Sequence, residues 1–400
     1  MNTVLIELYD NDALENIISL QLSRYDKLVF MCFKDSDPDQ KKRAVIRDII
    51  TSHTGTEVLF EEASEKNIDS AIKAFDSLLE RFPDSFFVAD MTGGDEIFIA
   101  ALSRFVSNGN VSRFSVHKSD VNKGSLTWMM GAQEPVCAPE EIALPFSFSD
   151  IIKLYGGAVI GSWPEEFSTI MAKKRYEILR VWNAVKDMSA DWNKFCSISY
   201  VNGVDPDENG VISRKFSKEN EITTSERIMQ RLEKRGIVKN YEVSRNYLKY
   251  KLQPSAETTD LYISSGTALE MYTALAAAGT GLFRECYTKV LLDCDGIISK
   301  WGSDPTNELD VTIMYGFVPI FISCKNTEPT KEFLYEIKTM ADHFGGKYGL
   351  PMLVSSKPAF QPVRERAKEM HIMLIDDVQS LSLKEFRAAI IKTIRKQSEL

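Results

Sequence analysis

The sequence lacks the features of a membrane or secreted protein. No apolar run approaches the roughly 18 residues that a membrane-spanning helix needs. The first residues, MNTVLIELYDND, lack the basic segment of a signal peptide. The six cysteines are scattered and form no CxxC pair. We therefore expect a cytoplasmic protein with reduced thiols, no structural zinc site and no membrane partner.

Several ligand-binding motifs are also missing. The chain has no GxGxxG or GxxxxGK[ST] sequence, which excludes a dinucleotide fingerprint and a Walker A loop. The stretch DPDENG begins like an EF-hand, but Phe216 stands where calcium needs a bidentate Glu, so we predict a turn. The net charge of −9 argues against a protein that coats nucleic acid non-specifically.

What is present is the composition of a globular protein of two or three domains, 400 residues long. In the first third, the β-like runs TVLIELY, KLVFMCF, EVLF and SFFVAD alternate with helical patterns, the first at residues 11–24. This alternation predicts a doubly wound, mostly parallel sheet. Ligands of such folds bind beyond the carboxyl ends of the strands. The candidate loops are residues 9–12, 33–38 and 90–95.

The middle of the chain follows another pattern. SDIIKLYGG and FSTIMAKKRYEILRVWNAVKDM read as connecting helices. TTSERIMQRLEKRGIVKNYEVSRNYLKYKL predicts an amphipathic helix that stops at Gly236 and then two alternating strands. This order is typical of the last helix and wing of a winged helix. Such modules bind DNA in some proteins and other proteins elsewhere, and both roles stay open.

The last third predicts a compact α/β domain with a mixed sheet, in the order helix, strand, strand, helix, strand, helix, strand. SSGTALEMYTALAAA is the first helix, and DVTIMY and PIFISCK are the paired strands. We divide the chain at residues 1–145, 146–255 and 256–400.

Three charges stand against the apolar strands of this last third. Glu308 and Asp310 point the same way because side chains two apart on a strand share a face. A hairpin that closes symmetrically about Phe317–Val318 would place Asp310 opposite Lys325. Paired carboxylates suit Mg²⁺ or Mn²⁺, which would lower the pKa of bound water, and the lysine could orient that water. This is the chemistry of metal-dependent phosphodiester cleavage.

Structural roles compete with this interpretation. Asp310 and Lys325 could form a cross-strand ion pair worth about 0.2–1 kcal/mol, and Glu308 could be solvated. Glu270 is a fourth acid on the preceding helix, but Thr267-Ala-Leu-Glu270 also fits a capping box.

A helix Glu, a strand Asp and a following xxK resemble the PD-(D/E)xK restriction-endonuclease-like nucleases. The resemblance implies that Glu270 is the helix acid, Asp310 the central metal ligand and Lys325 the catalytic lysine. The chain departs from the pattern at Ser323, where the family has Asp or Glu. Glu308 would then supply the missing metal-binding carboxylate.

A second motif lies in the first third, where SFFVADMTGGDEIFIAALSRF reads as strand, turn and helix. Free amides at a helix N-terminus bind anions, and glycines allow close approach to the backbone. Any βα turn can also carry TGG, so the motif alone decides little.

Strand, TGG and helix in the fourth unit resemble the CARF domain of type III CRISPR accessory proteins, which dimerises and binds cyclic oligoadenylates. The resemblance implies ligand contacts from Thr92, Gly93 and Gly94, and by position from Asp10–Asn11 and Lys34, Asp35 and Ser36. The family continues TGGTK, whereas this chain has Asp95 and Glu96, so a lysine's charge is missing from a site that includes Asp95.

GTALE, NELDV and ISCK after a TGG domain resemble the cyclic-oligoadenylate-activated CRISPR effector nucleases. That resemblance implies a homodimer activated by cyclic tetra-adenylate, or cyclic hexa-adenylate, with Mn²⁺ or Mg²⁺. Its substrates would be single-stranded DNA, RNA or supercoiled DNA. Three alternatives stay open: a winged-helix regulator with an inactive nuclease-like domain, a ring nuclease, and a repair or restriction nuclease without an activator.

Overall fold

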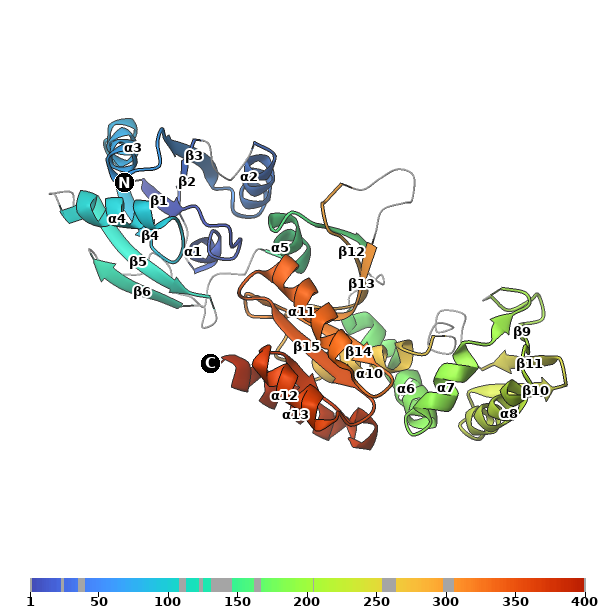
Figure 1. Ribbon diagram of the computed structural model, residues 1–400. Helices are drawn as coiled ribbons and strands as arrows, with labels where there is room; N and C mark the ends of the chain where they lie inside the picture. Colours follow the sequence, from blue (N-terminus) through green and yellow to red (C-terminus); the bar gives the residue numbers. More distant parts are fainter. Residues whose placement is uncertain are drawn as a thin grey trace.

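A computed structural model describes the fold (Figure 1). The described residues are 2–22, 25–34, 40–107, 113–121, 125–130, 146–161, 167–203, 205–253, 264–297 and 306–398. They form two six-stranded sheets and one four-stranded sheet. In this part of the chain, no helix combines the length and apolarity that a bilayer crossing requires. Two candidate site residues, Asp35 and Ser36, lie outside the described residues.

The N-terminal sheet confirms the doubly wound prediction. Its strand order is β3-β2-β1-β4-β5-β6, and every neighbouring pair is parallel except β5 and β6. The strands are β1 (Thr3–Leu8), β2 (Lys27–Phe33), β3 (Glu57–Ala63), β4 (Phe86–Asp90), β5 (Phe114–Asp120) and β6 (Ser125–Met130). The helices are α1 (Ile18–Leu22), α2 (Gln40–Thr54), α3 (Ile68–Arg81) and α4 (Glu96–Phe105).

Alternation along β1 separates two hydrophobic cores. Val4 and Ile6 pack with buried residues of α3 and α4, whereas Leu5 packs on the other face with residues of α2. Helices therefore cover both faces of the sheet, and the loops after its parallel strands gather at one edge.

The first predicted helix is shorter than the sequence pattern indicates. Residues 11–17 form turns, and α1 begins only at Ile18. The backbone amide of Asp10 donates to Asn16 Oδ1 at 2.8 Å, and Asn16 Nδ2 donates to the Asp10 carbonyl at 2.7 Å. These side-chain bonds compete with helical ones, so the apolar spacing was a poor guide here.

The middle of the chain contains the expected helix and hairpin. The four-stranded sheet has the order β10-β11-β9-β8. Its strands are β8 (Ser199–Tyr200), β9 (Val211–Lys215), β10 (Val238–Val243) and β11 (Tyr247–Leu252). The helices of this part are α7 (Ser189–Cys196) and α8 (Glu219–Lys234). Gly236, at φ +65°, follows α8 as expected. Its assignment as a winged helix stays a prediction.

The C-terminal sheet is mixed, as predicted, in the order β16-β15-β14-β13-β12-β7. Its strands are β7 (Ala158–Gly161), β12 (Cys286–Asp293), β13 (Thr306–Tyr315), β14 (Val318–Lys325), β15 (Leu350–Ser355) and β16 (Met373–Ile375). Its helices are α5 (Phe148–Leu154), α6 (Phe167–Val185), α10 (Thr267–Ala278), α11 (Lys331–Gly345), α12 (Gln361–Glu369) and α13 (Leu383–Ser398). The predicted order lacked β12 and α13, and β7 joins this sheet from the middle of the chain.

The helix α10 lies inside the protein. Each of its residues from Thr267 to Ala277 is buried, against the sheet, α6 and α13. A helix that is apolar all round must be enclosed in this way. It brings the charged residue Glu270 into the core beside β13 and β14.

Candidate functional sites

The first site lies on the β13–β14 hairpin, whose register differs from the expected one. The turn is at Gly316 and Phe317, with Gly316 at φ +59°, and Val311 pairs with Ile322. This register places Asp310 opposite Ser323 rather than Lys325. The prediction was wrong by two residues because it centred the turn one residue too late. A shift of two keeps every side chain on its expected face.

Asp310 is anchored by the strand that carries the lysine. Its Oδ2 accepts from the Cys324 amide at 2.6 Å and from Ser323 Oγ at 3.2 Å. Burial raises the pKa of Asp310, and the charge of Lys325 acts in the opposite direction. Lys325 Nζ lies 3.5 Å from Glu336 and 4.7 Å from the centre of the Phe333 ring, both on α11.

Glu270 is a carboxylate in the core. Burial, and next the charge of Asp310, raise its pKa to about 8. Its Oε2 has no hydrogen-bond partner within the described part of the chain. The capping-box alternative is wrong, because Gly266 is the N-cap and Thr267 is already the first helical residue. Glu270 therefore has no capping role that would account for burying an acid here.

Lys289 belongs to the same cluster and was missed from the sequence. Thr288 pairs with Val311 and Val290 with Leu309, so Lys289 lies between them, across from Asp310. It adopts φ +51°, a left-handed conformation that is costly for lysine. Its charge lowers the pKa of Glu270. The available signal was a lone lysine inside the apolar run CYTKVLLD.

The carboxylate oxygens of this site suit a hard divalent cation that keeps several water ligands. No group of three or more His, Cys, Asp or Glu side chains in the described ranges is arranged to hold a metal ion. Mg²⁺ usually takes one or two carboxylates and completes its shell with water and substrate phosphate. The pair Glu270 and Asp310, with a partnerless buried oxygen and the exposed Glu308 nearby, fits that mode.

We expect Gly266→Ala to lower activity without unfolding the protein. The added Cβ would lie 2.4 Å from Glu270 Oε1, which forces the carboxylate to move, whereas Gly266 has no positive φ. Misplacing a reacting group costs up to about 100-fold in rate. The measurement is the rate of the phosphodiester cleavage that the sequence predicts, with the melting temperature as the folding control. Gly161→Ala is a matched variant because its Cβ meets Leu291 only at 3.9 Å. Equal rates for both variants would contradict a role for Glu270.

The second site is a hollow of about 280 Å³ at the carboxyl edge of the N-terminal sheet. Four of the predicted binding residues line it: Asp10, Asn11, Gly94 and Asp95. Lys34 is exposed and follows β2, and does not line the hollow.

The loop after β1 holds the TGG loop. The Gly94 amide donates to Asp10 Oδ2 at 2.8 Å. The Thr92 hydroxyl is turned inward, since it donates to Asp90 and accepts from the Ser119 amide at 2.6 Å. The two loops are therefore linked by a hydrogen bond, and an anion that takes the Gly94 amide must displace the Asp10 carboxylate.

Lys66 supplies a cation that sequence reasoning did not find. Its Nζ lies 2.8 Å from Asp95 Oδ2 and 5.8 Å from the centre of the Phe33 ring. The hydrogen bond to Asp95 raises the pKa of Lys66. Lys66 follows β3, so its place at the carboxyl edge was the available signal. It brings a positive charge to the TGG loop from another βα unit.

A buried polar cluster lies beneath this loop. Asp90 Oδ2 accepts from Ser119 Oγ at 2.9 Å and also contacts Ser19, whose hydroxyl lies 3.0 Å from His117 Nε2. Burial opposes ionisation of Asp90, but hydrogen bonding and the charge of His117 outweigh it and lower the pKa. Burial and the nearby Asp90 raise the pKa of Glu7 well above its usual range.

We expect Glu7→Gln to stabilise the protein increasingly as pH rises. The folded state holds the Glu7 proton above the unfolded pKa of about 4.3, so wild-type stability falls by up to about 1.4 kcal/mol per pH unit from there to the folded pKa. Glutamine removes that loss. Urea unfolding at several pH values measures the difference, with the exposed Glu80→Gln as control. A stability difference that does not change with pH would contradict the buried proton.

Comparison with known proteins shows what the fold is similar to. No protein-family model matches the sequence, and no curated protein matches it. Can2 from Sulfobacillus thermosulfidooxidans, solved in complex with cyclic tetra-adenylate, matches with a TM-score of 0.65 at 15% identity, covering 98% of this chain and 99% of Can2. The chain shares the Can2 fold.

A second solved structure, protein VC1899 from Vibrio cholerae, matches with a TM-score of 0.72 at 14% identity. The match covers 99% of this chain and 98% of that one. At such identities the likeness establishes the fold alone. The resemblance predicted from the TGG and SCK motifs is thereby confirmed in the fold, which is shared with Can2 over nearly the whole chain.

Within this Can2-like fold, direct bonds join the two sites' domains. Asp12 accepts from the Tyr155 hydroxyl at 2.6 Å and from the Lys347 amide at 2.9 Å. Glu15 accepts from the Tyr348 hydroxyl at 2.7 Å and lies 2.5 Å from Lys347 Nζ. A Cβ on Gly93 would lie 2.5 Å from Glu15 Oε2. The TGG loop is thus one side chain away from the C-terminal domain.

Proposed function

We propose that the protein is a cyclic-oligoadenylate-activated, metal-dependent endonuclease of type III CRISPR defence. The observation that carries the proposal is the buried carboxylate of Glu270, partnerless at one oxygen in the described chain and set beside Asp310 and two lysines. Burying such a carboxylate costs several kcal/mol, and the charges of Lys289 and Lys325 offset that cost only in part, since the pKa of Glu270 stays raised. A purely structural domain gains nothing from burying this carboxylate, whereas a nuclease needs the carboxylate to bind its metal ion.

The residues of the proposed nuclease site have different tasks. Glu270 and Asp310 hold Mg²⁺ or Mn²⁺, with Glu308 at the rim. The bound metal supplies Lewis acidity toward a phosphate oxygen and lowers the pKa of its water. Lys325, kept in place by Glu336 and Phe333, orients the attacking water, and its charge offsets the charge that develops on the phosphate.

The N-terminal hollow is the proposed activator site, in a domain comprising residues 1–145. Can2, which shares the fold, was solved with cyclic tetra-adenylate. Its counterpart here would take phosphates at the Gly94 amide and Lys66, and adenine rings near Tyr9 and Phe33. The lining has three acids and one lysine. Binding therefore depends on backbone amides, stacking and a second copy of the chain across a homodimer axis.

Activation follows from the bonds between domains. When a phosphate displaces Asp10 from Gly94, the loop of residues 10–17 is free to shift, and this loop carries Asp12 and Glu15. The Lys347 and Tyr348 contacts transmit that shift to the C-terminal sheet. A ligand that binds the shifted loop more tightly than the resting one moves the equilibrium.

The test is cleavage of labelled single-stranded DNA, RNA and supercoiled plasmid with Mn²⁺, with and without cyclic tetra- or hexa-adenylate. We expect cutting only when activator and metal are both present. Cutting without activator would favour a repair or restriction nuclease. Loss of the activator itself would favour a ring nuclease, and no cutting at all would favour a regulator.

A further inference from the structure

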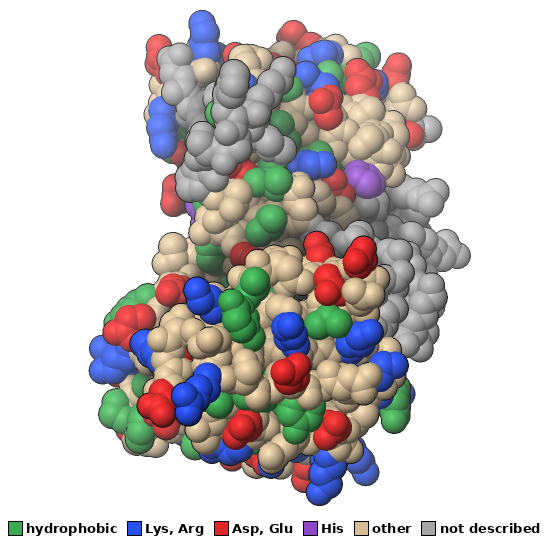
Figure 2. All heavy atoms as spheres, turned by 90° about the vertical axis from the view of Figure 1, so that its right-hand side faces the viewer, with side chains coloured by type: hydrophobic (Ala, Val, Ile, Leu, Met, Phe, Trp, Pro, Cys, Tyr) green, Lys and Arg blue, Asp and Glu red, His purple; other side chains and the backbone are tan. Residues whose placement is uncertain are grey.

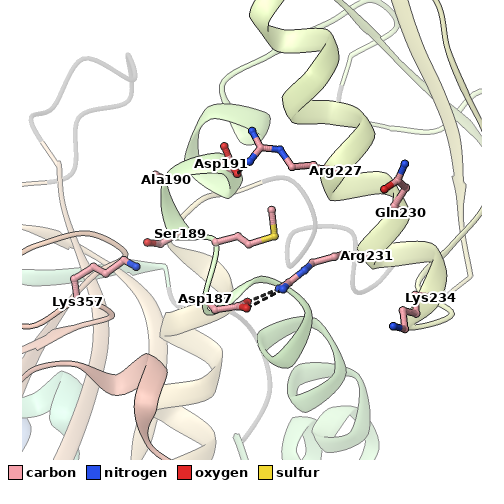
Figure 3. Close-up of a pocket in the computed structure, with 10 residues that line it drawn as sticks. Asp187, Ser189, Ala190, Asp191, Arg227, Gln230, Arg231, Lys234 and Lys357 are labelled. Atoms are coloured by element: carbon pink, nitrogen blue, oxygen red, sulfur yellow. Dashed lines mark hydrogen bonds and ion pairs between the residues drawn. The ribbon is translucent and has the colours of Figure 1, made fainter.

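A hollow of about 680 Å³ lies between α7, α8 and the loop after β15. Figure 3 shows Arg227, Arg231 and Lys234 along α8, and Lys357 on the opposite side of the hollow. We name this hollow the α7–α8 groove. It separates the small sheet's helices from the C-terminal domain, so it has one wall in each.

The two sides of α8 differ in character: one carries cations and the other is apolar. Arg227, Arg231 and Lys234 recur at helical spacing and share one side. Ile228 and Leu232 point into the core on the other side. The hydrophobic face fixes the helix, which leaves a rigid row of cations facing the groove.

The groove is positive although the chain is negative overall. Its lining has four cations, Arg227, Arg231, Lys234 and Lys357, and two acids, Asp187 and Asp191. The net of +2 (four minus two) contrasts with −9 for the chain. The face of the molecule drawn in Figure 2 carries Lys and Arg side chains interspersed with acids. The lining of the groove therefore has the opposite sign of charge from the chain as a whole.

Asp187 and Asp191 orient the two arginines, and an incoming phosphate has to compete with these two acids. Arg231 is paired with Asp187, and Arg227 lies 3.1 Å from Asp191. Arg227 is 57% exposed, and exposed pairs of this kind contribute about 0–1 kcal/mol. Arg231 is held more firmly, because both nitrogens of its fork contact Asp187 and one also donates to the Ala184 carbonyl at 3.1 Å. A backbone phosphate therefore competes most easily for Arg227 and the two lysines.

Both walls of the groove are connected to β14, the strand that carries Lys325. Asn193 of α7 donates to the carbonyl of Asn326 at 2.8 Å, and Asn326 donates back at 3.0 Å. Asn326 follows Lys325, and Lys325 pairs with Ser355, two residues before Lys357. Two extended residues and one strand spacing place Lys357 within about 12 Å of Lys325 between Cα atoms.

We propose that the α7–α8 groove binds the phosphate backbone of the nucleic-acid strand that the carboxylate site cuts. The inference rests on the proposed function and extends it by giving the middle of the chain a substrate-binding task. Arginine and lysine side chains on a rigid helix contact phosphates of any sequence, so the groove adds affinity and register without base specificity. A strand leaving the carboxylate site at the end of β14 enters the groove next.

The test compares two double variants with equal charge loss. Lys234→Gln/Lys357→Gln removes the groove lysines and leaves both arginine pairs in place. Lys368→Gln/Lys392→Gln is the control, since these exposed lysines line a separate hollow between α12 and α13. Each is made in wild type for kinetics and in Asp310→Asn for binding. Fluorescence anisotropy with activator and labelled single-stranded DNA, RNA or duplex measures Kd at several salt concentrations.

We expect the groove variant to raise KM and Kd about tenfold with kcat unchanged, and to lower the slope of log Kd against log salt by about 1.4, or 0.7 for each lost single-strand contact. The control should leave KM, Kd and the salt slope unchanged. An unchanged Kd in the groove variant would overturn the groove and leave the nuclease intact, and so would equal losses in both variants. No binding or cutting by the parent protein would overturn the proposed function, and the groove with it.

Discussion

Asp310→Asn should reduce activator-dependent cleavage by at least about 100- to 1,000-fold, because a carboxylate that holds the metal contributes several kcal/mol to the barrier reduction. Asparagine keeps the shape and an oxygen that can accept from the Cys324 amide. It removes the charge that neighbours Glu270. The loss therefore reports on chemistry rather than on folding. Cleavage rate with Mn²⁺ and cyclic tetra-adenylate is the measurement.

Two comparisons make this result specific. Asp310→Ala should lose cleavage as completely and still bind the activator, because Asp310 and the TGG loop belong to different sheets. Asp342→Asn removes one exposed carboxylate from α11, where it pairs with Lys338, and should stay within about twofold of wild type. Loss of both cleavage and activator binding in Asp310→Ala would contradict the two-domain assignment.

Gly94→Ala should weaken the response to activator. Gly94 has φ +102°, and a Cβ there would lie 2.4 Å from Leu8 Cβ and 2.7 Å from the Leu8 carbonyl oxygen. The loop must move away from the end of β1, which takes the Gly94 amide away from the place where the activator phosphate would bind. We expect the activator concentration for half-maximal cleavage to rise at least about tenfold, since 1.4 kcal/mol of misplacement gives that factor.

The matched control for this variant is Gly55→Ala. Gly55 also has a positive φ, +71°, but nothing lies within 4 Å of its added Cβ. It reproduces the conformational cost of about 1–2 kcal/mol without moving the loop. Activator titrations of both proteins, with melting temperatures, separate the two effects. The proposed activator site is contradicted when Gly55→Ala and Gly94→Ala shift the titration equally.

Sequence and structure differ most where side-chain bonds override spacing. Residues 11–17 have helical apolar spacing, yet Asp10 and Asn16 close them into turns that hold Asp12 and Glu15 against the C-terminal domain. The capping-box reading of Thr267 had the right spacing for a helix start, but Gly266 provides the N-cap. Asp10 and Asn16 are close in sequence, so the spacing rules failed locally. Tyr155 and Lys347, which bond Asp12, lie far along the chain, where no local pattern shows them.

Candidate residues show the same division. Asp310 and Lys325 were singled out because strand alternation fixes which way each side chain points, whereas Glu270 was noted as an acid on the preceding helix and takes its role from the resemblance. Lys289 and Lys66 were missed because their roles depend on which strand lies next to which. Neither the register of β12 nor the edge at which β3 ends can be predicted from the local spacing of residues.

The sequence by itself determined the doubly wound first sheet, the helix that carries Glu270, and the hairpin whose strands carry Asp310 and Lys325. Alternation and helical spacing are local properties that burial enforces. Only the tertiary structure decided that Asp310 faces Ser323, that Lys289 completes the carboxylate cluster, and that α8 faces Lys357 across a groove. These juxtapositions come from sheet order and packing, in which distant residues meet because the hydrophobic surfaces around them must be buried together.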